Sequence, residues 1–69
     1  MNFETAKEIY EAVARCDEHL NNICEIIEKI EEVTARKKFR QAVADVIGRI
    51  YTDIEMPLEL EHPSLRSNG

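Results

Sequence analysis

The sulfur and nitrogen side chains that could bind a metal are few: two cysteines and two histidines. Cys16 and His19 lie three residues apart, which would place both on one face of a helix at a spacing that suits metal ligation. Cys24 lies two helical turns beyond Cys16, and His62 lies near the end of the sequence. Because no CxxC or HxxxH pair is present, we expect neither a metal site nor a cofactor.

Catalytic groups are equally hard to assign. Glu59 and His62 have the Glu-x-x-His spacing of dimetal bundles, but only once and next to Pro63. No serine and no glycine-rich loop occurs in the region where helices are expected, and acidic neighbours of Cys16 and Cys24 disfavour a reactive thiolate. We therefore expect a protein that is not an enzyme.

The cysteines and the charge balance also bear on compartment and partners. Eight helical residues would separate Cys16 from Cys24 by about 12 Å, too far for a disulfide, so the cytoplasm is the expected location. The polar start MNFETAKE does not resemble a signal peptide, and no apolar run reaches the length of a membrane span. A net charge of −5 disfavours general affinity for nucleic acid or anionic lipid.

One long helix dominates the sequence. Apolar residues recur at alternating spacings of three and four, the seam of a helix that packs lengthwise on other helices. This pattern predicts a helix over about residues 3–32, capped by Asn2 or by Thr5 with Glu8. The members of the seam are Ala6, Ile9, Val13, Cys16, Leu20, Ile23, Ile27 and Ile30.

A second helix is predicted over about residues 35–55, with an apolar stripe of Phe39, Val43, Val46 and Ile50. Phe39 follows Ile30 by nine residues, about half a turn around a helix, so the apolar face changes sides between them. This change favours a hairpin, with a turn at about residues 32–35 and Thr34 as helix cap. One continuous helix is the alternative, because the segment contains neither glycine nor proline.

After the second helix we expect a change of structure. Pro57 should end the helix, since the residue before a proline is pushed out of the α region. Met56, Leu58 and Leu60 then alternate with Glu59 and Glu61, a pattern typical of extended chain. Residues 56–69 are therefore predicted to be an extended tail that is partly disordered at its end.

The expected architecture is all-α: a two-helix antiparallel hairpin over residues 1–55 that dimerises into a four-helix bundle. Both apolar stripes are too broad for one hairpin to cover, and a two-fold dimer would bury them. The relative orientation of the two hairpins stays open. The residues expected in the core or dimer interface are Ile9, Val13, Cys16, Leu20, Ile23, Ile27, Phe39, Val43, Val46 and Ile50.

The expected function is a small protein-interaction or regulatory module, whose partners are a second copy of itself and another protein. Glutamates at strict seven-residue spacing would form the back of the first helix, here called the glutamate ridge: Glu4, Glu11, Glu18, Glu25 and Glu32. Candidate partner surfaces are ridge members Glu11, Glu18 and Glu25, together with Met56, Leu58 and Leu60. The alternative is a dimeric hairpin that binds nucleic acid through a basic cluster, Arg36, Lys37, Lys38 and Arg40, although no recognition motif accompanies it.

Overall fold

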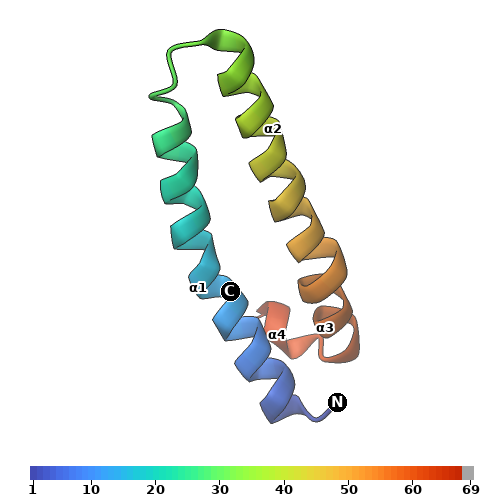
Figure 1. The fold of residues 1–69 in the computed structure, drawn as a ribbon. Coiled ribbons are helices and arrows are strands. Elements are labelled where there is room, and N and C mark those ends of the chain that lie inside the picture. Colours follow the sequence, from blue (N-terminus) through green and yellow to red (C-terminus); the bar gives the residue numbers. More distant parts are fainter. Residues whose placement is uncertain (68–69) are drawn as a thin grey trace.

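Two long helices form the body of the protein. The computed structural model describes residues 1–67, in which all regular structure is helical, so the all-α prediction is confirmed. Helix α1 spans Phe3–Ile27 and helix α2 spans Val33–Ile50. The two helices run side by side in opposite directions and are joined by residues 28–32 (Figure 1). The helix pair runs along most of the length of the molecule (Figure 1).

Helix α1 begins where the sequence predicts and ends earlier. Asn2 is its cap, because the side-chain Oδ1 accepts a hydrogen bond of 2.8 Å from the backbone N–H of Thr5. The predicted end near residue 32 is wrong, since α1 stops at Ile27. Beyond it, the N–H of Ile30 bonds to the carbonyl of Ile27 at 3.0 Å, which tightens the last turn and turns the chain away.

Helix α2 begins at Val33 rather than at about residue 35, and its cap is Glu32 rather than Thr34. The two carboxylate oxygens of Glu32 accept hydrogen bonds from the backbone N–H groups of Thr34 at 3.0 Å and Ala35 at 2.7 Å. These bonds lower the pKa of Glu32, because they stabilise the charged carboxylate. With one oxygen for each, a single carboxylate satisfies two free donors at the positive end of the helix.

The predicted helix end at Pro57 and the extended tail that follows are wrong. Residues Tyr51–Glu55 form one π-helical turn, in which the N–H of Met56 bonds to the carbonyl of Tyr51. This wider turn leads directly into helix α3, Met56–Glu61. Pro57 falls in the first turn of α3, where its missing N–H is tolerated. The chain therefore stays helical and reverses only at His62 and Pro63.

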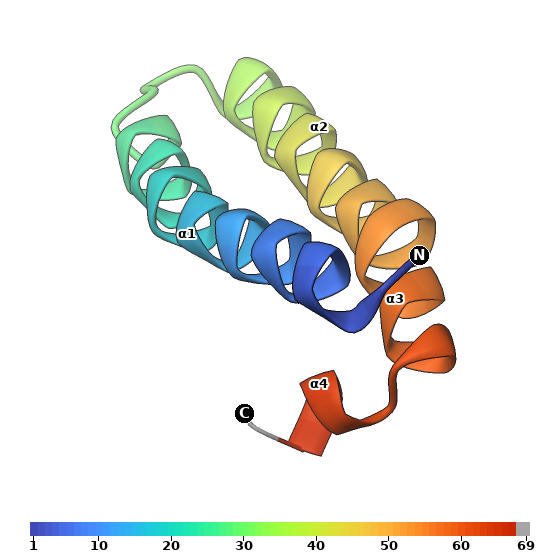
Figure 2. The same ribbon diagram turned by 90° about the horizontal axis from the view of Figure 1, so that it is seen from below.

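The short helix α4, Ser64–Ser67, folds back toward the start of α1 (Figure 2). Leu58 of α3 and Leu65 of α4 are buried against Ala6, with Phe3, Ile9 and Tyr10 packed around them. The segment after residue 55 thus docks on its own chain. Asn68 and Gly69, where we expected disorder, lie outside the described residues.

Polar contacts reinforce this closed end of the molecule, which we call the terminal end. Tyr10 donates a 2.7 Å hydrogen bond to Glu59, which ties α1 to α3. The amino group of Met1 lies 2.7 Å from a carboxylate oxygen of Glu61. The ring of His62 packs edge-on against Phe3 with centroids 5.5 Å apart. The opposite end, with the connecting segment 28–32, is called the loop end below.

Candidate functional site

One side of the helix pair carries a groove lined by apolar side chains alone. Its volume is about 340 Å³. The α1 residues are spaced by three and four, which places them on one stripe of the helix that faces a matching stripe of α2. The lining residues are Leu20, Ile23 and Ile27 of α1 and Phe39, Ala42, Val43 and Val46 of α2, and together they are called the apolar groove.

Contact between α1 and α2 covers only part of the two apolar stripes. Of the ten residues expected in the core or dimer interface, Ile27 is buried at 6% exposure, and Ile9, Val13, Leu20, Val43 and Ile50 are half-buried. The other four are exposed in the single chain: Cys16, Ile23, Phe39 and Val46. Phe39 and Val46 keep 51% and 49% of their surfaces in water. The burial of these four residues therefore depends on a second molecule and stays a prediction.

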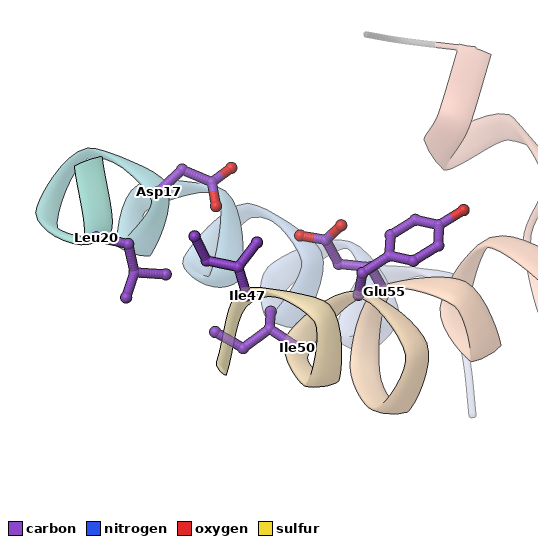
Figure 3. Close-up of a pocket in the computed structure, with 6 residues that line it drawn as sticks. Asp17, Leu20, Ile47, Ile50 and Glu55 are labelled. Atoms are coloured by element: carbon purple, nitrogen blue, oxygen red, sulfur yellow. The ribbon is translucent and has the colours of Figure 1, made fainter. Parts of the chain in front are cut away.

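A second hollow, of about 290 Å³, lies where α1 passes the π-helical turn. Figure 3 shows Asp17 of α1 on one side of it, with Ile47, Ile50 and Glu55 opposite. Asp17 lies about 120° around α1 from Ile23, so this hollow opens on a different side from the apolar groove. Burial raises the pKa of Glu55, and the nearby negative charges of Asp17 and Glu59 raise it further. The acidic groups would repel an anionic ligand.

The four residues of the predicted basic cluster do not share one role in the structure. Arg40 makes two hydrogen bonds to the carboxylate of Glu28, at 2.6 and 3.0 Å, and this pairing lowers the pKa of Glu28. Arg36 donates a 3.1 Å bond to the carbonyl of Ile30 and so ties the start of α2 to the connecting segment. Lys37 and Lys38 are exposed. Two of the four basic side chains thus hold the loop end of the helix pair together.

The two predicted partner surfaces differ in how far the structure exposes them. Ridge members Glu11, Glu18 and Glu25 are exposed along the back of α1. Leu58 is only 5% exposed, so its assignment to a partner surface is wrong: it belongs to the core of its own chain. Met56 and Leu60 keep 38% and 76% of their surfaces exposed. The alternation that we took for extended chain therefore does not mark one side of α3, since Leu58 is buried while Leu60 is exposed.

Sequence reasoning missed two features of these surfaces. Leu65, 4% exposed, is part of the core at the terminal end. Leu58 and Leu65 lie on separate helices with Pro63 between them, so no helical spacing in the sequence pointed to their contact. Asp17 shares a seven-residue spacing with Tyr10 and Cys24, which places it at the edge of the α1–α2 contact.

Within residues 1–67, no helix is both long and apolar enough to span a bilayer. The same part of the chain contains no group of three or more histidine, cysteine, aspartate or glutamate side chains placed to hold a metal ion. No protein-family model, no curated protein and no solved structure matched this chain.

Proposed function

We propose that this protein is a non-enzymatic interaction module whose working form is a homodimeric four-helix bundle. In this proposal, the helix pair is a hairpin, and two hairpins pack through the apolar groove. Ile23, Phe39 and Val46 would pass from water into the bundle core. The observation that carries the proposal is the amount of surface that the single chain leaves in contact with water.

The accessible surface of the chain is 5349 Å². A compact monomer of 8.0 kDa has about 4,450 Å². The excess of about 900 Å² is similar to the about 800 Å² that each partner buries in a standard stable interface. Much of the excess is apolar, since Phe39, Val46 and Ile23 are 51%, 49% and 44% exposed. A second copy offers a matching apolar surface, because a two-fold axis brings identical patches together.

The outer faces of such a bundle would carry its interactions with other proteins. The glutamate ridge lies on the back of α1, and Glu11, Glu18 and Glu25 in it are exposed. A dimer would present two of these ridges, each suited to a basic partner surface. Leu60 at the terminal end, 76% exposed, adds an apolar contact point outside the groove.

The alternative function, nucleic-acid binding through the basic cluster, has weaker support. Arg36 and Arg40 are engaged at the loop end, which leaves Lys37 and Lys38 as the exposed cations of the cluster. Binding to mixed RNA and DNA at low and moderate salt tests this alternative. Steeply salt-sensitive binding that Lys37→Glu and Lys38→Glu together abolish would favour it over the interaction module.

Solution mass tests the proposed dimer. Light scattering at low micromolar concentration with reductant should give twice the chain mass of 8.0 kDa. Phe39→Asp should return the protein to a helical monomer, because Phe39 is exposed in the single chain and would be buried only in the dimer. Leu60→Asp is the matched control, since Leu60 is exposed and lies outside the groove. A monomeric unmodified protein would overturn the proposal.

A further inference from the structure

The charges of the chain are unevenly distributed along its 47 Å length. Residues 25–41, at the loop end, carry five basic and four acidic side chains, a net charge of +1. The middle, residues 13–24 and 42–51, carries two basic and three acidic side chains, a net charge of −1. The terminal end, residues 1–12 and 52–69, carries two basic and seven acidic side chains, a net charge of −5.

Two two-fold arrangements could join two chains through the apolar groove. With the loops at the same end, the two terminal ends would lie together, and each carries a net charge of −5. With the loops at opposite ends, each loop end of +1 would lie beside a terminal end of −5. Every helix has an antiparallel neighbour in the other chain in both arrangements, so helix dipoles do not distinguish them. Side-chain charge does.

Screening does not remove this difference. Neighbouring helices in a bundle lie about 8–10 Å apart, which is comparable with the Debye length of about 8 Å at physiological ionic strength. Charges at the far end of the molecule are several Debye lengths away and contribute little. The arrangement is therefore decided by which ends lie side by side.

We propose, on the basis of the dimer proposed above, that a second copy of this chain binds the apolar groove head to tail, with its terminal end beside the loop end of the first. Exposed Lys38, four residues before Ala42 and so at the edge of the groove, then lies beside the acidic terminal end of the other copy. Arg40, which pairs with Glu28, holds the loop end in shape for this contact. The charge gradient sets the orientation that the apolar surfaces alone leave open.

Two matched charge-reversal substitutions distinguish the two possible orientations of the dimer. Lys38→Glu changes the loop end from +1 to −1, and Lys7→Glu changes the terminal end from −5 to −7; both lysines are exposed. In the head-to-tail dimer, Lys38→Glu should raise the dissociation constant several-fold, while Lys7→Glu should leave it unchanged or lower it. The opposite order, with Lys7→Glu the more damaging, would overturn the head-to-tail arrangement.

A direct distance measurement gives the decisive result. Cys16→Ala and Cys24→Ala remove the two cysteines, and a spin label attached through Glu31→Cys then reports on the loop end. Head to tail, the two labels should lie at a separation comparable with the 47 Å length of the chain. With both loops at one end, the separation would be about 10–20 Å, the spacing of neighbouring helices plus the labels.

The outcomes of this experiment are distinct. A mass of two chains with the long separation supports the head-to-tail dimer. A mass of two chains with the short separation overturns the orientation and leaves the dimer in place. A mass of one chain overturns the dimer itself, and the orientation with it.

Discussion

At the scale of single residues, the contact between Tyr10 and Glu59 links elements far apart in the sequence. The Tyr10 hydroxyl donates a 2.7 Å hydrogen bond to the Glu59 carboxylate. This bond raises the pKa of Tyr10 to about 12, and partial burial and the Glu59 charge add to the shift. Ionisation of the phenol would remove the donor and place two negative charges together.

The sign of the linked effect on stability follows from this pKa. The folded protein keeps the phenol proton between pH 10.0 and about 12, where the unfolded chain has lost it. The contribution to stability is therefore fully present below pH 10.0 and is lost as the pH rises through about 12. Alkaline conditions should loosen α3 from α1 before the long helices separate.

Glu59→Gln should move the pKa of Tyr10 down toward 10.0, because the amide accepts a hydrogen bond without a negative charge. Ultraviolet absorbance of tyrosinate during a pH titration measures this shift, in a Tyr51→Phe background that leaves Tyr10 as the only tyrosine. Glu11→Gln, at an exposed carboxylate on α1, is the control and should leave the titration unchanged. An unshifted titration in Glu59→Gln would contradict the assigned cause.

At the scale of elements, α3 and α4 act as one closing unit at the terminal end. The π-helical turn Tyr51–Glu55 carries the chain past Pro57, and the reversal at His62 brings α4 under α1. Leu58 and Leu65, at 5% and 4% exposure, then cover Ala6. The start of α1 is thus held by packing rather than by the connecting segment at the loop end.

Leu65→Ala should destabilise the protein by about 2–5 kcal/mol, the usual cost of removing a buried leucine side chain. The matched control is Leu60→Ala, which should change stability by less than about 0.5 kcal/mol because Leu60 is 76% exposed. Urea denaturation followed by circular dichroism measures both. Equal effects of the two substitutions would show that α4 does not pack as described.

At the scale of the whole molecule, the chain is long and thin. Its dimensions are 47 × 17 × 17 Å, and its radius of gyration is 14.9 Å. A compact domain of 69 residues has a radius of gyration of about 11 Å. Among the residues that the structure describes, four apolar side chains are buried: Ala6, Ile27, Leu58 and Leu65. So small a core makes folding of the single chain marginal, which is why association should dominate its stability.

Two observations should follow from stability through association. The midpoint of thermal unfolding should rise with protein concentration, because a dimer is favoured by mass action. Leu20→Asp should lower helicity and mass together, since Leu20 lines both the apolar groove and the second hollow. Circular dichroism and light scattering measure these effects. A folded Leu20→Asp monomer of normal helicity, or a concentration-independent midpoint, would contradict this account.

Much of the fold could be predicted because helix formation is local. The spacing of Ala6 through Ile30 identifies α1, and Asn2 is correctly identified as its cap. The cap of α2 was missed because Thr34 is a better cap by residue type, while Glu32 wins by supplying two acceptor oxygens. For the candidate site, the sequence identified all the groove residues except Ala42 as core or interface positions, since they share its apolar stripes.

The sequence by itself determined two amphipathic helices and the direction of their apolar faces, because a side chain's place on a helix follows from its spacing from its neighbours. The tertiary structure decided the path of the chain after Glu55. Proline and alternation are local features, and both favoured extended chain there. The π-helical turn leads into α3 with Pro57 in the first turn of that helix, where a missing N–H is tolerated. The packing of Leu58 and Leu65 on Ala6 then stabilises helices that the local sequence alone does not specify. Contacts between the first and last segments of the sequence depend on how the long helices are joined, and only the folded molecule brings these two segments together.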